Sequence, residues 1–568
     1  MNNRTFKTRL LWTAAIAAAA ITGLGFRLAF LHLGDQKPTS RAYKEKLIAG
    51  RGNICDRNGR SNILAMNLVV KDICVNPSAV TKNDRLIETA SVLSERLGMD
   101  AEQVAWNIKS RSESKFAYVK RFVPSEQASE IEQLKLKYVH FEEDIIRYYP
   151  HRSFMCHLLG FVNHEGVGSS GVELKVDKYL KGSHGRIVSK QDANQHELYR
   201  CRDDHVPAKK GSNVELTVDQ NVQYIVEKAL DEVMVEHNAK AAWAAVQRVK
   251  TGEILAMASR PAFDPNEFNK VKADERMNRV IGCNYEPGST MKAVVFSAAL
   301  NEGAVKTNTM INCENGSWMY ARKPLRDCHG YGMLSFSDCL KKSSNIASAK
   351  LALMLGKNTL YSYLTAFGMG SRTGVDLPGE EAGILHPVKK WTKISPTRLA
   401  IGQGVSATSL QILNLYCTIA NDGVRMKPYV VKSISSPDGE AVYRGKPRMV
   451  GRPITEETAS TMKKLLFNVT EDGGTGRRAR VAGYEIAGKT GTAQKVIDGA
   501  YSTTAYVGSF VGFIPAGDPE IGIIVVVDEP QPYHTGGVVA GPAFKKIAEQ
   551  TVRCLDVEPS RYSFAKRD

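Results

Sequence analysis

The sequence Glu286-Pro287-Gly288-Ser289-Thr290-Met291-Lys292 is followed along the chain by Ser343-Ser344-Asn345 and by Lys489-Thr490-Gly491-Thr492. Together the three strings supply a serine hydroxyl, a lysine amine, a second hydroxyl, an amide and a second cation. These are the groups needed to open an amide bond through a covalent acyl-enzyme. Each string is short and carries little weight alone, so its surroundings decide its value.

The residues around Ser289 favour a helix that begins at this serine. Pro287 and Gly288 mark its start, and apolar residues follow Lys292 as far as Leu300. Residues three apart share a helix face, so the Ser289 hydroxyl and the Lys292 amine can meet. A serine in the first turn also lies beside free backbone N–H groups, which can stabilise an oxyanion.

Parts of this pattern recur elsewhere: Ser-x-x-Lys begins also at Ser112, Ser460 and Ser563, and Lys-Thr-Gly begins also at Lys250. Ser460-Thr461-Met462-Lys463 is identical to the first string, but it lies inside residues 456–466, which already have a helical pattern. We interpret Ser460 as a surface residue of that helix. Lys250-Thr251-Gly252 joins two apolar runs and is typical of the tip of a β-hairpin, where a lysine is solvated.

The middle string also has a structural interpretation. Ser and Asn are favoured at helix N-caps, and residues 345–355 are predicted to form a helix, so Ser343-Ser344-Asn345 is by itself typical of a cap. Its occurrence together with the other two strings favours the functional interpretation.

Lys489 belongs to a competing pattern as well. Residues 483–490 fit the G-x-x-x-x-G-K-[ST] signature of a phosphate-binding loop, and residues 521–529 resemble the second conserved strand of a nucleotidase. A phosphate loop must lead directly into a helix, whereas residues 491–494 favour an extended chain. Glu485 would also place a negative charge in the phosphate loop. We therefore interpret Lys489 as part of a strand.

The N-terminal residues predict a membrane anchor. Basic residues precede an uncharged run from Leu10 to Phe26, and the apolar character resumes after Arg27 as far as Leu33. The length of the run suits a membrane-spanning helix, and the basic flank marks the cytoplasmic side. The alternative is a signal peptide cleaved near the small residues 18–20. In either case everything after Leu33 is expected to lie outside the cytoplasm.

Length and composition are those of a multidomain globular protein. A chain of 568 residues is too long for one hydrophobic core, and 43% apolar with 24% charged residues is ordinary for folded domains. The net charge of +17 suits anionic membrane and cell-wall surfaces, or a solvated surface without a specific partner. No zinc spacing or RNA-stacking motif accompanies it, so a nucleic-acid partner is not expected.

The ten cysteines lack the paired spacings of a metal site, and no metal is expected. Disulfides are possible in an exported protein. Cys313 with Cys328, which flank a loop containing Gly and Trp, is the pair to test first. Most of the other cysteines are expected to be buried thiols.

With these motifs, the chain resembles a class B penicillin-binding protein over nearly its whole length. Residues 489–494, 509–513 and 528–530 resemble the division-specific members more than the elongation members. Further matches to the motifs of the pedestal and of the catalytic domain are Arg51 to Gly59, Arg147 to Pro150, Gly171 to Glu173, Thr251 to Met257, Asp376 to Glu380 and Gly402 to Gly404.

The resemblance implies an α+β protein with the penicillin-binding or serine-transpeptidase fold, an antiparallel sheet flanked by helices. An irregular α+β pedestal domain and one N-terminal transmembrane helix precede it. The expected boundaries are a cytoplasmic tail at 1–9, a transmembrane anchor at 10–33, a linker at 34–50, a non-catalytic pedestal or dimerisation-like domain at 51–215, a transpeptidase domain at 216–556 and a C-terminal tail at 557–568.

The activity that the resemblance implies is that of a peptidoglycan D,D-transpeptidase in septal cell-wall synthesis, and of a target of β-lactams. Ser289 would attack the carbonyl of the penultimate D-alanine of a stem peptide. Lys292 can act as the base only if it is neutral, which requires a pKa about three units below the usual value of about 10.4. Burial beside Lys489 is the expected cause.

The same resemblance implies the remaining roles. Ser343 would relay a proton to the leaving amine, and Asn345 would hold the substrate amide. The backbone N–H groups of Ser289 and Thr492 would form the oxyanion hole. The groups expected to bind the terminal carboxylate belong to Lys489, Thr490, Gly491 and Thr492.

No metal or organic cofactor is implied. The implied partners are peptidoglycan stem peptides, β-lactam antibiotics, the membrane, a membrane glycosyltransferase and other division proteins. The implied location is the bacterial cytoplasmic membrane, with a single span and an extracytoplasmic catalytic domain. A β-lactam-sensing receptor or an idle scaffold is disfavoured by the single visible span and the intact polar groups. A hydrolytic β-lactamase or carboxypeptidase activity stays open, because it depends on the fate of the acyl-enzyme.

Overall fold

The computed structural model describes residues 3–33, 41–59, 61–191 and 202–559. The chain divides into two compact units, residues 1–49 with 183–209 and residues 50–182 with 210–568. Parts of the predicted tails and linker lie outside the described residues, namely 1–2, 34–40 and 560–568, and so does Cys201.

The first unit contains one long apolar helix, α1 (Asn3–Leu33). Its residues from Phe6 to Phe30 have a mean hydropathy of 1.6, and their side chains are exposed. A helix of this length and composition can cross a membrane, although a signal sequence has the same properties. The helix includes the predicted anchor at 10–33.

A small antiparallel sheet completes the first unit, in the order β1-β6-β7. Its strands are β1 (Arg41–Leu47), β6 (Gly185–Gln191) and β7 (Asp204–Val206). Residues 41–47 were predicted as linker, and they instead form a strand because β6 pairs with β1 along its whole length. A partner so far along the chain leaves no local signal in a charged segment.

The second unit begins with an irregular α+β region built on one long strand, β3 (Ile63–Val75). This strand pairs antiparallel with β4 (Ala117–Pro124) and β5 (Val139–Tyr148). The helices α3 (Leu86–Leu97), α4 (Ala101–Lys109) and α5 (Ser125–Gln133) pack apolar faces against it. Shorter elements are β2 (Ile54–Cys55), α2 (Pro77–Lys82), α6 (Cys156–Leu159), α7 (Gly171–Lys175) and α8 (Asp177–Leu180).

Three motif residues of this region form a buried ion-pair network. The Glu173 side chain is fully buried, and its two oxygens lie 2.8 Å from Arg51 Nε and 2.6 Å from Arg147 Nε. Arg51 also pairs with Asp177 at 2.6 Å. Removing one partner of such a network would leave an unpaired buried charge and strongly destabilise the fold. We therefore interpret these motif residues as structural.

One sheet connects this region with the rest of the second unit. β8 (Asn213–Leu216) pairs parallel with β2 and antiparallel with β16 (Val431–Ser435), which in turn pairs with β17 (Ala441–Arg444). The strand order is therefore β17-β16-β8-β2-β3-β4, with β5 also on β3.

A five-stranded antiparallel sheet forms the centre of the remaining part, in the order β10-β9-β21-β20-β19. Its strands are β9 (Ala241–Arg248), β10 (Ile254–Arg260), β19 (Ala487–Ile497), β20 (Ala500–Ile514) and β21 (Ile521–Asp528). The central strand β21 is an Ile- and Val-rich run buried along its whole length, as expected for a strand covered on both faces. β19 lies at the edge of the sheet.

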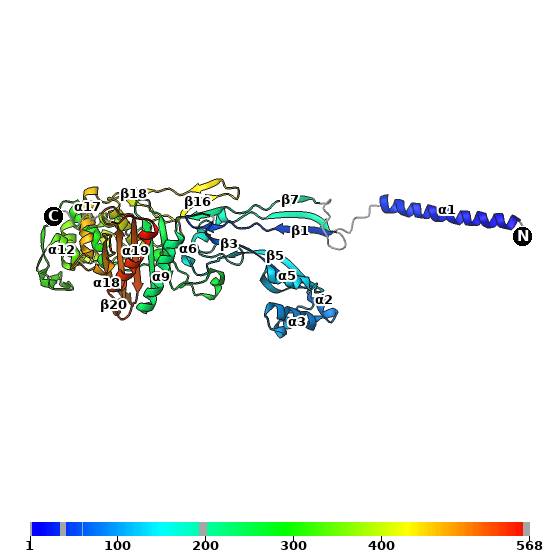
Figure 1. Ribbon diagram of the computed structural model, residues 1–568, viewed down its shortest axis with the longest axis horizontal. Helices are drawn as coiled ribbons and strands as arrows, with labels where there is room; N and C mark the ends of the chain where they lie inside the picture. The colour runs from blue at the N-terminus through cyan, green and yellow to red at the C-terminus, as the bar shows by residue number, and fades with distance from the viewer. Residues whose placement is uncertain (1–2, 34–40, 60, 192–201, 560–568) are drawn as a thin grey trace. The chain divides into compact units, whose positions relative to one another are not determined.

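Successive residues of β9 point to opposite faces of this sheet. Ala242 and Ala244 pack with α9 (Gln220–Glu236) and α19 (Gly541–Cys554), which lie side by side on one face (Figure 1). Trp243 and Ala245 belong to the core on the other face, under α11 (Lys292–Asn301), α16 (Ser409–Ala420) and α17 (Glu456–Thr470). The predicted helix-flanked antiparallel sheet is confirmed.

Several local predictions are also confirmed. The hairpin predicted over 241–259 is β9 and β10, and the helix predicted after Asp219 is α9, whose N-cap is Asp219. The helix predicted over 345–355 is α13 (Asn345–Leu355). The remaining elements are α10 (Arg279–Gly282), β11 (Met310–Asn312), β12 (Ser317–Tyr320), β13 (Lys323–Arg326), β14 (Met333–Ser335), α12 (Phe336–Lys341), α14 (Lys357–Ala366), α15 (Ser395–Leu399), β15 (Arg425–Met426), β18 (Met449–Gly451), α18 (Gly536–Val539) and the 3₁₀ turns Pro265–Lys270, Gly288–Met291, Glu314–Gly316, Val388–Lys390 and Arg477–Ala479.

Candidate active site

Ser289 lies in a tight turn directly before α11. The turn, Gly288–Met291, is a 3₁₀ helix, and it begins at a glycine whose φ is +57°. Inside the turn the Thr290 hydroxyl donates to the Pro287 carbonyl at 2.8 Å, and the buried Tyr416 hydroxyl donates to the Thr290 carbonyl at 2.9 Å. These bonds fix the backbone that carries the half-buried Ser289.

Lys292, the first residue of α11, has no exposed surface and points at the second string. Its Nζ lies 3.1 Å from Ser343 Oγ, 2.7 Å from Asn345 Oδ1 and 2.5 Å from the Ser343 carbonyl oxygen. All three are acceptors, so the amine is fixed by hydrogen bonds rather than by a carboxylate.

Ser343 occupies a backbone position that normally favours glycine. It follows α12 with a φ of +61°, its N–H donates to the Leu340 carbonyl, and the next N–H donates to the Cys339 carbonyl. This pair of bonds is the Schellman arrangement that ends many helices. A side chain here costs about 1–2 kcal/mol, so the hydroxyl is kept at a position where glycine would be more stable.

The next two residues start α13 and are held by an acid that sequence reasoning missed. Ser344 caps the helix by accepting from the Ala347 N–H at 3.0 Å. Asp327 accepts from the Ser344 hydroxyl at 2.6 Å and from the Asn345 and Ile346 N–H groups. Asp327 belongs to no recognisable motif, so only the folded contact identifies it.

Lys489 reaches the same hydroxyl from the edge strand β19. Its Nζ is fully buried and lies 2.9 Å from Ser343 Oγ. Two residues further on, Gly491 allows close packing, because an added Cβ would lie 2.4 Å from Ser509 Oγ and 3.0 Å from the Pro287 carbonyl oxygen. The predicted cation and the predicted Ser343 are thus in direct contact.

The two threonines of the third string differ in accessibility. Thr490 is buried, and its hydroxyl donates to Thr475 Oγ1 at 3.1 Å. Thr492 is exposed, and its Oγ1 accepts from the Gly536 N–H at 3.0 Å. Because that oxygen acts as an acceptor towards Gly536, the Thr492 hydroxyl proton is available to a ligand.

The backbone of Thr492 approaches the turn that carries Ser289. A Cβ added to Gly288 would lie 2.9 Å from the Thr492 carbonyl oxygen and 3.4 Å from its nitrogen. Only a glycine before Ser289 permits this distance. The two N–H groups predicted to form the oxyanion hole, those of Ser289 and Thr492, therefore belong to neighbouring backbone segments.

The pKa values of both lysines are lowered. Burial lowers the pKa of Lys292 to about 8, and the Asp327 carboxylate partly opposes this effect. Burial, and then the charge of Lys292, lower the pKa of Lys489 well below its usual value. The prediction for Lys292 was that burial beside Lys489 lowers its pKa. Burial does lower it, whereas the repulsion between the two cations lowers the pKa of Lys489. The pair favours a state with one neutral amine.

The structure excludes the competing interpretation of Lys489 as part of a phosphate loop. Residues 487–497 form β19, which runs antiparallel to β20, and no helix follows Lys489 in this described segment. The repeated strings lie elsewhere: Ser460 is exposed on α17, Lys463 pairs with Asp422 at 2.8 Å, and Lys250 at the hairpin tip pairs with Asp518 at 3.0 Å.

The cysteine pair selected from the sequence does not form. Cys328 is exposed, and the sulfur neighbour of the buried Cys313 is Cys339, with the two Sγ atoms 4.0 Å apart. Cys339 lies in α12, beyond both predicted partners in the sequence. In the described part of the chain, no cluster of His, Cys, Asp and Glu could hold a metal ion.

Comparisons with known proteins find family matches over most of the chain. Residues 242–549 match the penicillin binding protein transpeptidase domain, and residues 46–216 match the penicillin-binding protein dimerisation domain. Stage V sporulation protein D of Bacillus subtilis is 34% identical, over 100% of this chain and 89% of that protein. Peptidoglycan D,D-transpeptidase FtsI of Escherichia coli is 31% identical, over 91% of this chain and 85% of that protein.

Solved structures share the fold over most of the chain. A peptidoglycan synthetase from Bifidobacterium adolescentis has a TM-score of 0.73 and 28% identity, and the match covers 92% of this chain and 98% of that one. Penicillin binding protein 3 from Mycobacterium tuberculosis, complexed with aztreonam, has a TM-score of 0.70 and 27% identity, over 91% of this chain and 98% of that one.

Proposed function

The chain belongs to the class B penicillin-binding proteins, which are serine-type D-Ala-D-Ala transpeptidases, and we propose that Ser289 is its nucleophile. The enzyme would cross-link peptidoglycan stem peptides through an acyl-enzyme on this serine. One observation carries the proposal. Lys292, Ser343 and Lys489, which are far apart in the sequence, meet at a single oxygen next to the turn that holds Ser289.

In the first step the Ser289 hydroxyl attacks the carbonyl of the penultimate D-alanine, and the neutral Lys292 amine takes its proton. The burial that lowers the pKa of Lys292 to about 8 supports this role, because it makes the neutral amine accessible near physiological pH. The N–H groups of Ser289 and Thr492 stabilise the oxyanion. Losing one such donor typically lowers the rate by about 10²–10³.

The terminal D-alanine then leaves as an amine, which must receive a proton. Ser343 Oγ lies within 3.1 Å of both lysine amines, so it can pass a proton from Lys292 to the leaving nitrogen. Asn345 would bind the substrate amide. Its orientation is fixed, because its Oδ1 accepts from Lys292 and its Nδ2 donates to the Arg326 carbonyl at 2.8 Å.

The third string would bind the terminal carboxylate of the substrate. Lys489 supplies the positive charge, and the exposed Thr492 hydroxyl supplies a donor. Thr490 is the inner residue of this group, and Gly491 allows the strand to lie against the Ser289 turn. A bound carboxylate stabilises the charged form of Lys489, and this favours the neutral form of Lys292.

An amine from a second stem peptide then accepts the acyl group and forms the cross-link. A β-lactam would acylate the same serine, because its strained amide resembles the D-alanyl-D-alanine terminus. The complex of the solved penicillin binding protein 3 with aztreonam supports this extension to β-lactams.

The cellular role that we propose is septal cell-wall synthesis at the cytoplasmic membrane. The apolar α1 would be a single-pass anchor, with the pedestal at 51–215 and the transpeptidase domain at 216–556 outside the cytoplasm. The similarity to FtsI supports a division role. The expected partners are a membrane glycosyltransferase and other division proteins.

Labelling with fluorescent penicillin tests the nucleophile. The full-length protein in detergent is labelled as wild type, as Ser289→Ala and as Ser460→Ala, and the modified peptide is mapped. Ser460 is a matched control because it begins an identical Ser-Thr-Met-Lys string on an exposed helix face. We expect labelling of the Ser289 peptide in the wild type and in Ser460→Ala, and none in Ser289→Ala. An adduct on any other serine would refute the assignment.

The fate of the acyl group separates transfer from hydrolysis. A labelled donor peptide is incubated with and without an acceptor amine, and the cross-linked and hydrolysed products are quantified. A transpeptidase is expected to give the cross-linked product when acceptor is present. Hydrolysis that is unchanged by acceptor would instead indicate a carboxypeptidase or β-lactamase.

A further inference from the structure

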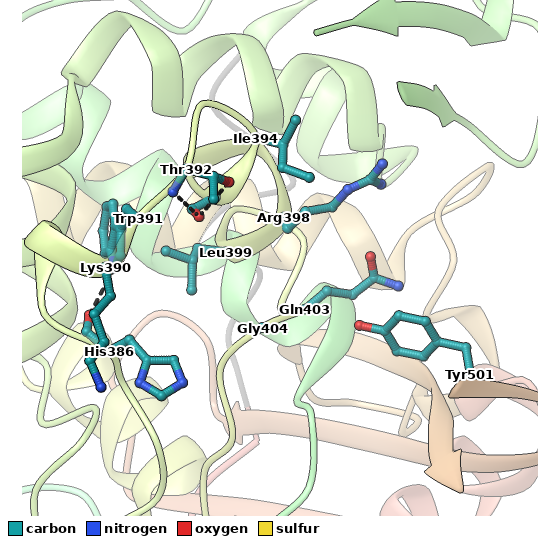
Figure 2. A pocket seen from close by; sticks show the side chains of 11 residues that line it. His386, Lys390, Trp391, Thr392, Ile394, Arg398, Leu399, Gln403, Gly404 and Tyr501 are labelled. Atoms are coloured by element: carbon teal, nitrogen blue, oxygen red, sulfur yellow. Dashed lines mark hydrogen bonds between the residues drawn. The ribbon is translucent and has the colours of Figure 1, made fainter. Parts of the chain in front are cut away.

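A cavity of about 530 Å³ lies beside the turn that carries Ser289. Three segments line it: residues 386–395, residues 398–404 and Tyr501 of β20. None of these lining residues was given a catalytic or substrate-binding role above. Figure 2 shows Arg398, Gln403 and Tyr501 at one end, and His386, Lys390 and Trp391 at the other, with Leu399 between them.

The wall of this cavity is attached to the residues before Ser289. A Cβ on Gly402 would lie 2.2 Å from the Gly288 carbonyl oxygen, and the Gly288 N–H donates to the Gly402 carbonyl at 3.3 Å. The Gly404 N–H and the Tyr501 hydroxyl both donate to one carboxylate oxygen of Glu286, at 2.8 and 3.2 Å. The cavity is therefore held next to the proposed nucleophile.

The lining is cationic and partly apolar. Arg398, Lys390 and His386 are its ionisable bases, Trp391 and Leu399 are buried, and no Asp or Glu is among the residues that line it. Among the described ion pairs, none includes Arg398 or Lys390. The Arg398 guanidinium donates to the Pro324 carbonyl at 3.1 Å. Such a site suits an aliphatic chain that ends in a carboxylate.

The edge strand β19 gives the direction from which such a chain would come. An extended peptide can add to a sheet edge as a further strand. With its terminal carboxylate at Lys489 and Thr490, a peptide antiparallel to β19 would extend towards Val496. That residue is paired with Tyr501, at the cavity wall. Each peptide residue advances about 3.4 Å along the strand, and the side chains of the two D-alanines are single methyl groups. The residue just before them is therefore the first whose side chain can be long enough to extend towards the cavity.

We propose that this cavity binds the side-chain carboxylate of the stem-peptide residue that precedes the two D-alanines. The proposal rests on the function proposed above and adds a substrate preference to it. The ligand is an amino-dicarboxylic residue whose aliphatic side chain lies against Trp391 and Leu399, while its carboxylate pairs with Arg398 or Lys390. A donor in which this carboxylate is amidated lacks the ion pair.

Two donor peptides test the proposal with the full-length enzyme in detergent. Both end in D-Ala-D-Ala, and they differ only in the preceding side chain, which carries a carboxylate in one and the matching carboxamide in the other. Release of D-alanine gives kcat/KM for each. We expect the wild type to prefer the carboxylate donor by about tenfold or more, as a charge-assisted bond implies. Arg398→Gln or Lys390→Gln should bring the ratio towards one.

Three controls keep the test specific. Lys464→Gln removes an exposed cation from α17 and should leave the ratio as in the wild type. Arg398→Lys should retain a preference that Arg398→Gln loses. Lys390→Gln tests the cavity even if Arg398→Gln fails to fold, because Lys390 is an exposed residue.

Different results would overturn the carboxylate site and the transpeptidase function. Equal kcat/KM values for the two donors in the wild type, or a ratio unchanged in both cavity variants, would overturn the carboxylate site and leave the transpeptidase function intact. Release of D-alanine from neither donor, together with no penicillin label on Ser289, would overturn the proposed function and the carboxylate site with it.

Discussion

Lys292 and Lys489 donate hydrogen bonds to one and the same oxygen atom, the hydroxyl of Ser343, at 3.1 and 2.9 Å. Both lysines are fully buried, and two ammonium groups so close together repel each other. Burial lowers the pKa of both lysines, and the charge of Lys292 lowers that of Lys489 further. The shared hydroxyl connects the amine that follows the Ser289 turn with the amine on β19. A proton can therefore move through Ser343 without a water molecule.

Replacing Lys292 removes the proposed base. Lys292→Ala should reduce the rate of acylation by penicillin by about 10²–10⁴, the usual contribution of a positioned base. A time course of labelling with fluorescent penicillin, quenched at set times, measures this rate. Lys463→Ala is the control, because Lys463 ends the identical string on α17 and pairs with Asp422 instead. Normal acylation by Lys292→Ala would refute its role as the base.

The acylation rate should rise with pH. The pKa of Lys292 is lowered to about 8 by burial, so the amine is protonated and inactive at lower pH and neutral at higher pH. Below that pKa the neutral fraction falls by about tenfold per pH unit, and at pH 7 it is about one tenth. Second-order acylation rates measured between about pH 6 and 9 test this. A rate that is constant or falls over this range would contradict the assignment.

Asp327 should set the position of that pH profile. Its carboxylate raises the pKa of Lys292 and also binds the N–H of Asn345. Asp327→Asn keeps a similar shape but removes the charge, so the pKa of Lys292 should fall and the acid limb should move to lower pH. A merely structural role would lower the rate at every pH without moving the limb.

At Ser343, one substitution is expected to raise stability and lower activity. Its φ of +61° favours glycine, so Ser343→Gly should raise the free energy of unfolding by about 1 kcal/mol. Ser343→Ala lacks this gain, and both variants should lose most of the acylation rate because the hydroxyl is absent. Thermal unfolding and penicillin labelling measure the two effects. A Ser343→Gly variant that acylates normally would exclude the proton relay.

Gly288 should be needed for the contact between the Ser289 turn and β19. Gly288→Ala would place a Cβ 2.9 Å from the Thr492 carbonyl oxygen, and the displaced turn should reduce acylation by at least about tenfold. Gly303→Ala is a matched control, since Gly303 has a φ of +65° but no atom within 4 Å of the added Cβ. It should lose stability and keep its rate. Equal rates in both variants would contradict the prediction.

Much of the fold followed from local patterns. Alternating and continuous apolar runs predicted the hairpin of β9 and β10, and Asp219 predicted the start of α9. The charged segment 41–47 gave no such signal, because its pairing with β6 depends on residues far along the chain. The cysteine pairing failed for the same reason: Cys339, not Cys328, approaches Cys313 once α12 is folded.

For the candidate site too, some features could be predicted from the sequence and others only from the folded chain. The sequence alone determined the proposed chemistry, since the order and type of Ser289, Lys292, Ser343 and Lys489 already indicate a serine acyl-enzyme. Only the tertiary structure decided which hydroxyl both amines share, that Asp327 holds the second string, and that a cationic cavity adjoins the Ser289 turn. Residue types fix which bonds can be made or broken, whereas distance and burial arise from contacts between segments that no local pattern encodes.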